Sequence, residues 1–428
     1  MKAKIVKKGQ LSRGRKASII LVLGTLIAIG PFSIDAYLPA FKQIARDFRV
    51  DTSVVGLTLT TYFIGIGLGQ LAYGPLMDRF GRRKPLIVGL ILYIVTSIMS
   101  AYAWNVESLA TLRFFTSVGA CAGMVASKAI VRDLFEEEDV AEVLSTLMLI
   151  MGIAPIIAPT IGGFVIENFH WDFIFYGLAA FAFLMLVNVV FILPESTSPN
   201  REQSLHPLPV FREYLEIYRN TDFFLFSTAR GFVIGLLLGY VAAAPFVFME
   251  YFEMSQSQFG YIFGGNAAGL IAGSQVNRLL LKRYTTFEIT YVVSLLLVIV
   301  TVFGLVYINL FDINFWVVYP VLFLMLTLVG FQNPNVTALS LRPFTIKAGS
   351  ASALVGAVSM IFGSLASWIV SHFLNADLLP LFLMLAVSAI FAHIAVELYR
   401  KKFAHGYAFA KTYIKHPRYK GKKKHSFQ

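Results

Sequence analysis

The stretch GPLMDRFGRRKPL, residues 74–86, places five charged residues between two long apolar segments. A short charged turn between apolar runs of about 20 residues is typical of a loop that joins two membrane-spanning helices. The composition agrees, because 57% of the 428 residues are hydrophobic and only 14% are charged. These values differ strongly from those of soluble domains and predict an all-α integral membrane protein.

Hydropathy divides the chain into twelve predicted spans, whose boundaries are marked by Gly, Pro and charged residues. The first six lie near residues 17–39, 54–76, 85–103, 109–131, 142–166 and 172–193. The second six lie near residues 223–250, 257–281, 287–308, 315–338, 349–370 and 378–399. The first span follows a basic segment, as a signal peptide would, but it lacks an A-x-A cleavage pattern. We therefore expect it to be a retained helix.

The polar, proline-rich segment that begins PESTSPNREQSLHPLP separates the first six spans from the second six. It predicts four parts, namely an N-terminal six-helix bundle (1–194), a cytoplasmic central loop (195–222), a C-terminal six-helix bundle (223–399) and a basic cytoplasmic tail (400–428). The tail mixes basic and aromatic residues, which is also compatible with nucleic-acid binding. Contact with anionic lipid fits a chain of twelve spans better, so no nucleic acid is expected as a partner.

The distribution of Lys and Arg predicts the orientation in the membrane. An even number of spans places both termini on one side. With both termini inside, only Lys42, Arg46 and Arg49 fall in outer loops, and Arg113 and Arg230 fall within spans. Because Lys and Arg concentrate in loops that stay in the cytoplasm, we expect both termini and residues 74–86 to be cytoplasmic.

The opening stretch resembles the loop signature G-x-x-x-D-R-x-G-R-R/K of the major facilitator superfamily. The matching residues are Gly74, Asp78, Arg79, Gly81, Arg82, Arg83 and Lys84. Glycines permit a tight turn, and a carboxylate at a helix end can pair with neighbouring arginines or face the N-terminus of another helix. The resemblance implies an inner gate at this loop. The alternative is a basic turn that only sets the topology.

The predicted fourth span carries a second similarity to the same superfamily. Arg113 and Gly119 fit its fourth-helix pattern R-x-x-x-x-x-G. Arg132 and Asp133 match the pair that closes this helix on the inner side. The resemblance therefore adds Arg132 and Asp133 to the predicted inner gate.

The predicted fifth span reads MGIAPIIAPTIGG and resembles the antiporter signature G-P-x-x-G-P-x-x-G-G. Ala154 and Ala158 replace its first two glycines. The retained residues are Pro155, Pro159, Gly162 and Gly163. Because small residues preserve close helix packing, the resemblance implies the bend of an antiporter helix here.

Together, PFSIDAYLPAF, DRFGRRKPL, APIIAPTIGG and AGSASAL are similar to the bicyclomycin and chloramphenicol resistance branch of drug:proton antiporters. This resemblance implies proton-coupled efflux of drugs or related small molecules across the bacterial inner membrane by alternating access. It also implies a monomer that uses the proton gradient and no cofactor. The implied fold has two pseudo-symmetric six-helix bundles with a substrate cavity between them.

The second half departs from the pattern of the first. Its stretch GSQVNRLLLKR, residues 273–283, resembles a decayed copy of the opening motif. Asn277 stands where Asp78 stands in the first half. We therefore expect any gate in the second half to lack the carboxylate.

Charges within spans are expensive and call for a partner or a watery cavity. Asp35 and Arg113 both lie roughly 6–8 Å inside predicted helix ends, at about 1.5 Å per residue. We expect Asp35 to bind and release a proton during transport, and Arg113 to hold Asp35 ionised until proton or substrate arrives. In the alternative, Arg113 snorkels to the lipid headgroups and Asp35 is solvated.

Other polar residues in the spans are candidates for the substrate cavity. Arg230 has two possible partners, an anionic group of the substrate or Glu250. Lys128 is expected to join the inner charge cluster with Arg132 and Asp133. The amide residues among the candidates could instead hydrogen-bond neighbouring helices. The predicted cavity set is Tyr37, Arg230, Asn266, Gln332, Asn333 and Asn335.

No nucleotide-binding loop, pair of catalytic carboxylates, zinc-ligand spacing or nucleophile elbow occurs in the sequence, so neither an enzyme nor a metal site is predicted. A lone cysteine, Cys121, excludes an intrachain disulfide. The expected partners are a small-molecule substrate, protons and the lipid bilayer. The alternatives to drug efflux are export of an amino acid or siderophore, proton-linked import, or a membrane receptor that transports nothing.

Overall fold

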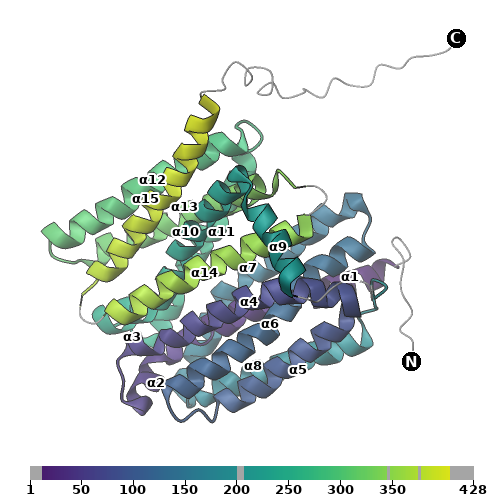
Figure 1. Cartoon of the computed structure of the whole chain (residues 1–428). Coiled ribbons are helices and arrows are strands. Elements are labelled where there is room, and N and C mark those ends of the chain that lie inside the picture. Colours follow the sequence, from purple (N-terminus) through teal and green to yellow (C-terminus); the bar gives the residue numbers. More distant parts are fainter. Residues whose placement is uncertain (1–11, 200–206, 345–347, 375–376, 405–428) are drawn as a thin grey trace.

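The computed structural model describes residues 12–199, 207–344, 348–374 and 377–404, which form helices and no β-strand (Figure 1). The first half contains α1 (Arg13–Asp35), η1 (Leu38–Ala40), α2 (Phe41–Phe48), α3 (Thr52–Val55), α4 (Leu57–Phe80), α5 (Arg83–Ser100), α6 (Val106–Leu134), α7 (Glu137–Asn168) and α8 (Asp172–Phe191). The second contains α9 (Pro207–Tyr218), α10 (Thr221–Pro245), η2 (Phe246–Tyr251), α11 (Gln256–Leu280), α12 (Thr286–Leu310), α13 (Phe315–Leu341), α14 (Ala348–Phe373) and α15 (Leu379–Ala404).

Eleven helical segments in the described residues are long and apolar enough to cross a membrane. The one predicted span that is not among these eleven is the eighth, 257–281, which corresponds to α11; this helix is 25 residues long but carries several polar and glycine residues that lower its hydropathy. α11 packs between α7 and α13, so protein rather than lipid surrounds much of it. The protein therefore has the twelve transmembrane helices that the sequence predicts.

The twelve helices form two six-helix bundles, drawn in purple to blue and in teal to yellow in Figure 1. The bundles meet where α4 packs against α14 and where α7 packs against α11. α4 and α11 are the second long helices of their halves, and α7 and α14 are the fifth. Each contact thus joins a second helix to a fifth helix, as a two-fold relation between the halves requires.

Small residues allow α7 to approach its neighbours closely. Its helix is continuous through Pro155 and Pro159. A Cβ on Gly162 would lie 2.2 Å from the carbonyl oxygen of Ala36, so a side chain at that position would collide with the end of α1. Gly163 lies next to the start of α11, at the junction of the bundles. The antiporter-like signature therefore coincides with a tight contact among α1, α7 and α11.

We call the face that holds the start of α1 and the α4–α5 turn the basic face, and the face that holds α2 and α3 the opposite face. Near the opposite face the bundles are linked by hydrogen bonds. Thr60 Oγ1 and Ser367 Oγ lie 2.9 Å apart, and Ser257 donates to Glu167. Each ion pair among the described residues, in contrast, joins two residues of the same half.

The contact between α4 and α14 loosens toward the basic face. Gly67 of α4 lies close to Met360 of α14, and Gln70 lies against Gly356. Gly74 occupies the next position on the same face of α4, but a Cβ there would meet nothing within 4 Å. α4 therefore contacts α14 at Gly67 and Gln70, whereas the space beside Gly74 is open.

The predicted central loop contains a helix that the sequence did not suggest. α9 packs against α10 and α14, and its Tyr214 hydroxyl donates to the carbonyl of Leu71 in α4 at 3.4 Å. α9 thus lies across both halves at the basic face (Figure 1). The predicted tail from residue 400 begins inside α15, and residues 405–428 lie outside the described residues.

Candidate functional site

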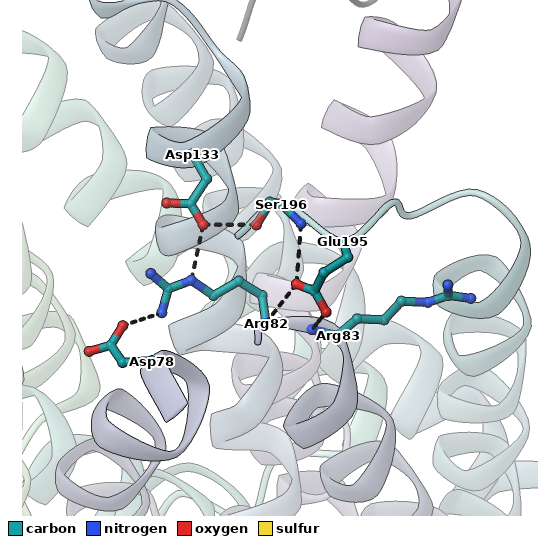
Figure 2. A network of polar contacts seen from close by, with 6 residues as sticks. All are labelled: Asp78, Arg82, Arg83, Asp133, Glu195 and Ser196. Carbon is teal, nitrogen blue, oxygen red and sulfur yellow. Dashed lines mark hydrogen bonds and ion pairs between the residues drawn. The ribbon is translucent and has the colours of Figure 1, made fainter. Parts of the chain in front are cut away.

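Arg82 is at the centre of a polar network at the basic face, in the turn between α4 and α5 (Figure 2). Its Nη1 donates to Asp78 Oδ1 at 2.5 Å, and its Nε donates to Asp133 Oδ2 at 3.0 Å. Burial alone would lower the pKa of Arg82, but the hydrogen bonds and charges of Asp133 and Asp78 outweigh burial and raise this pKa. The guanidinium therefore stays charged while it joins the ends of α4 and α6.

Glu195 and Ser196 complete this network, and the sequence did not identify either of them. Glu195 accepts from the backbone nitrogens of Arg82 at 2.8 Å and Arg83 at 3.3 Å. Ser196 donates through its hydroxyl to Asp133 Oδ2 at 2.8 Å. Both residues are buried, so the start of the central loop is fastened to the α4–α5 turn. A carboxylate directly after Pro194, at the end of a span, was the available signal.

Gly81 provides the backbone conformation that this arrangement requires. Its φ is +83°, a backbone conformation that residues other than glycine rarely adopt. A Cβ at Gly81 would lie 2.8 Å from Glu195 Oε2. Gly81 therefore permits both the backbone conformation of the turn and the close approach of the Glu195 carboxylate.

The side chains of the remaining predicted gate residues lie beside the network rather than in it. Arg83 contributes its backbone nitrogen, while its guanidinium donates to the carbonyl of Val190 in α8. Arg79 lies over the ring of Phe80 at 5.8 Å, and Arg132 is exposed on the basic face. The predicted gate residues therefore fall into two groups, namely those whose side chains bond within the network and those whose side chains lie beside it.

Arg113 is enclosed by an aromatic box that consists of Tyr37, Tyr62 and Phe175. Its guanidinium carbon lies 4.7 Å, 4.3 Å and 5.9 Å from the three ring centroids. Nη2 donates to the carbonyl of Ser33 at 3.0 Å, and the residue is 0% exposed. The alternative in which Arg113 snorkels to the headgroups is therefore wrong, because cation–π contacts replace water around it.

Asp35 does not pair with Arg113, which corrects the predicted direct interaction. Ser33 faces the interior of the first bundle, where its hydroxyl contacts Tyr93. Asp35 follows two residues later, about 200° around the helix, and therefore points to a different side of α1. Its charge is within electrostatic range of Tyr62 in the first bundle and of Tyr240 in the second. Asp35 is 5% exposed, and its carboxylate has no hydrogen bond or ion pair among the described residues.

The structure also sorts the predicted cavity residues. Tyr37 is part of the aromatic box, and its hydroxyl lies 3.0 Å from Thr58 Oγ1, so its polar group already has a partner within the first bundle. Asn335 forms two reciprocal hydrogen bonds with Asn277, at 3.1 Å and 2.8 Å, and therefore joins α11 to α13. Asn266 donates to the Tyr240 hydroxyl at 2.6 Å. Tyr37, Asn266 and Asn335 therefore contribute to packing between helices. For the two asparagines, the sequence analysis had given this role as the alternative to lining the cavity.

Gln332, Asn333 and Arg230 remain candidates for the cavity. Neither side-chain amide atom of Gln332 has a hydrogen-bond partner among the described residues, nor does Oδ1 of Asn333. Arg230 donates from Nε to Thr337 Oγ1 at 2.7 Å and from Nη1 to Ser359. No contact joins Arg230 to Glu250 among the described ion pairs, so that alternative is not supported.

A separate apolar groove lies among α10, α14 and α15. Its lining includes Phe232, Phe362 and Phe391. The neighbouring Leu365 and Leu383 are half exposed on the outside of the second bundle, as residues that face lipid are. This groove contains none of the charged residues described above, so we do not assign it to the transport route.

Two six-helix bundles that meet through corresponding helices are an arrangement found in secondary transporters. A sequence profile of the Major Facilitator Superfamily matches residues 21–367, and the chain belongs to this superfamily. The protein is therefore a membrane transport protein and not an enzyme.

Relatives make the family resemblance more specific. The bicyclomycin resistance protein homolog of Haemophilus influenzae is 31% identical over 353 residues, which cover 81% of this chain and 87% of that protein. Multidrug resistance protein D of Escherichia coli is 24% identical over 372 residues, which cover 82% of this chain and 88% of that protein. These similarities confirm the resemblance to the drug-resistance branch.

Among solved structures, the crystal structure of a D-xylose-proton symporter superposes with a TM-score of 0.69 at 14% sequence identity. The match covers 88% of this chain and 97% of that chain. At this identity the likeness shows the fold alone, and the fold agrees with the two bundles described above.

Proposed function

We propose that this transporter exports drugs or related small molecules from the cytoplasm of a bacterium in exchange for protons. The relatives named above carry bicyclomycin or multidrug resistance in their names. Both termini and the basic face would be cytoplasmic, because Lys and Arg concentrate on that face. The working unit would be a monomer in the inner membrane, with no cofactor and no nucleic acid as a partner.

The observation that carries the proposal is the position of Asp35. It is a buried carboxylate without a described partner, and its charge is within electrostatic range of Tyr62 in its own half and of Tyr240 in the other half. Burying an unpaired ionised carboxylate costs free energy, whereas a proton removes the charge. A change in water access at the junction would therefore change the occupancy of the proton site, which is the coupling that an antiporter requires.

Arg113 acts in this proposal as a positioning residue. Its bond to the Ser33 carbonyl holds the last turn of α1, and the aromatic box holds the guanidinium. The end of α1 that carries Asp35 is thereby fixed to the interior of the first bundle. Arg113 supports the proton site through the backbone of α1 rather than through a direct ion pair.

Alternating access would use the separation of the halves at the basic face. In the described arrangement, α4 contacts α14 at Gly67 and Gln70, whereas the space beside Gly74 is open. Substrate would enter from the cytoplasm, and rocking of residues 1–194 against residues 223–399 would then open the other side. At about 100 mV each inward proton supplies about 2.3 kcal/mol, which suffices to concentrate a neutral substrate.

The test uses inverted membrane vesicles with an inward-acid gradient whose collapse is followed optically. Chloramphenicol, bicyclomycin, cationic dyes and small amino acids form the panel. We expect one compound class to collapse the gradient in the wild type but not in Asp35→Asn. Asp51→Asn makes the same chemical change at an exposed position and should behave as the wild type.

The outcomes separate the alternatives. Retained proton-driven transport in a folded Asp35→Asn variant would refute the role of Asp35. Collapse by amino acids alone would indicate a metabolite exporter, and uptake in place of efflux would indicate an importer. No proton-linked flux of any compound would favour a receptor that transports nothing.

A further inference from the structure

Two cationic side chains from different bundles lie within electrostatic range of each other. Lys128 belongs to α6 in the first bundle and Arg230 to α10 in the second. The positive charge of Arg230 reaches Lys128. Neither residue forms an ion pair with a carboxylate among the described residues. Like charges at one place in a membrane protein are unfavourable unless an anion or water compensates them.

Arg230 is held in one orientation. It lies nine residues after the start of α10, or about 14 Å along the helix. Its Nε donates to Thr337 of α13, and its Nη1 donates to Ser359 and to the carbonyl of Val355 in α14, the latter at 3.2 Å. These acceptors are neutral, so they position the guanidinium without neutralising it. Nη2 has no hydrogen-bond partner among the described residues.

Lys128 approaches the same place from the first bundle. It lies six residues before the end of α6, or about 9 Å along the helix, and about 60° around the axis from Arg113. It is exposed although Ser127 and Ile130 beside it are buried. The sequence assigned Lys128 to the charge cluster at the helix end. In the structure Lys128 also lies within electrostatic range of Arg230 in the other half.

Contacts through α4 support this neighbourhood independently. Cys121 of α6 donates to the carbonyl of Ile66 in α4. One turn further along α4, Gln70 packs against Gly356, which lies between the two α14 residues that accept from Arg230. The Lys128 helix and the Arg230 site are therefore on two sides of one α4–α14 contact.

Unpartnered amides lie on the same part of α13. Thr337, which accepts from Arg230, donates to the carbonyl of Asn333 one turn away at 2.7 Å. Oδ1 of Asn333 and both amide atoms of Gln332 are buried without described partners. Buried polar atoms are nearly always hydrogen-bonded in proteins, so these groups indicate a place for a polar ligand or water.

We propose that Lys128 and Arg230 bind the anionic group of the transported substrate, with the amides of Gln332 and Asn333 bonding its neutral polar part. This inference rests on the proposed function and specifies its substrate class as molecules with a carboxylate, sulfonate or phosphate group. Export of a monoanion against one proton would move two positive charges inward per cycle.

The test measures binding to the purified full-length protein with matched benzene derivatives. Benzoate, benzenesulfonate and phenyl phosphate are the anionic probes, benzamide is neutral, and benzylamine is cationic. Isothermal titration at fixed ionic strength should show binding of the anions and much weaker binding of benzamide and benzylamine. Loss of one charge-assisted contact in Lys128→Gln or Arg230→Gln should weaken benzoate binding about tenfold to a hundredfold.

Matched variants keep the test independent of folding. Lys282→Gln and Arg283→Gln remove exposed charges elsewhere and should leave benzoate binding unchanged. Arg230→Lys keeps the charge and should restore most of the binding. Lys128→Glu leaves one negative and one positive charge at the site and should abolish the preference for benzoate over benzamide.

Equal binding of benzoate and benzamide by the wild type would overturn the inference, as would unchanged benzoate binding in both glutamine variants. Its failure is distinct from failure of the proposed function. Proton-linked efflux of a neutral drug without anion preference would retain the function and remove the anion site. Anion binding without proton-linked flux would retain the anion site and remove the proposed function.

Discussion

The second helices of the two bundles, α4 and α11, end in related sequences but make different contacts. In α4, Asp78 pairs with Arg82, which also pairs with Asp133, and these charged groups are partly exposed, with 48% of the Asp78 side chain accessible. In α11, Asn277 occupies the corresponding motif position and forms a reciprocal amide pair with Asn335. Asn277 and Asn335 are 2% and 1% exposed.

This difference indicates which of the two helix ends is suited to rearrange. Water can solvate the charged groups of the first bundle when their bonds break, so breaking them costs little free energy. The amide pair of the second bundle would lose its hydrogen bonds without access to water, which costs more. We therefore infer that the first bundle carries the gate that opens, whereas α11 and α13 move together.

The largest expected effect comes from moving the carboxylate into the second bundle. Asn277→Asp removes the amide donor and places an ionisable group in a buried position. We expect a loss of about 3 kcal/mol in the free energy of unfolding, because a buried group loses its partner. Thermal unfolding of the detergent-solubilised protein measures this effect as a lower Tm. A Tm equal to that of the wild type would show that the site is wetter than its burial suggests.

An intermediate effect is expected at the turn of the first bundle. Gly81→Ala imposes a side chain at φ +83° and directs its Cβ at Glu195. We expect a loss of about 2 kcal/mol from the backbone strain, seen as a lower Tm. Gly74→Ala is the matched control, because a Cβ there meets nothing within 4 Å, and it should leave Tm unchanged. Equal effects of the two substitutions would contradict the role assigned to the Gly81 conformation.

The smallest expected effect is the converse exchange, Asp78→Asn. The ion pair with Arg82 is partly exposed and contributes about 1 kcal/mol at most, so Tm should barely change. If this contact stabilises one state of the gate, the same energy corresponds to about a fivefold loss of turnover. Transport rates in vesicles and substrate affinity, measured separately, check this expectation. Unchanged turnover would remove Asp78 from the gate.

Sequence reasoning singled out the α4–α5 turn, the predicted gate, because its residues are contiguous. Residues 78–83 belong to one motif, and glycine and charge patterns report local chemistry. Glu195 and Ser196 were missed because they join that turn from more than 110 residues away, as the bond between Glu195 and Arg82 shows. α9 was missed for a related reason, because it packs on α10 and α14 inside a segment that is locally polar and rich in proline.

The charged residues within the spans show most clearly which features the sequence predicts and which it does not. Asp35 and Arg113 lie at matched depths in the sequence, and depth alone suggested an ion pair. The structure directs Arg113 into the aromatic box, leaves Asp35 at the junction of the bundles and brings Lys128 within range of Arg230. Depth follows from position along a helix, but partners follow from the rotation of each helix about its axis.

The amino-acid sequence by itself determined that this protein spans the membrane twelve times, in two related halves, with its basic loops on one face. Those features follow from local hydropathy and charge, because each span exchanges water for lipid largely on its own. The tertiary structure decided which polar groups meet, where the halves touch and which charges have no described counter-ion. These features depend on side chains from distant helices that share one packed interior, and no local pattern encodes that packing.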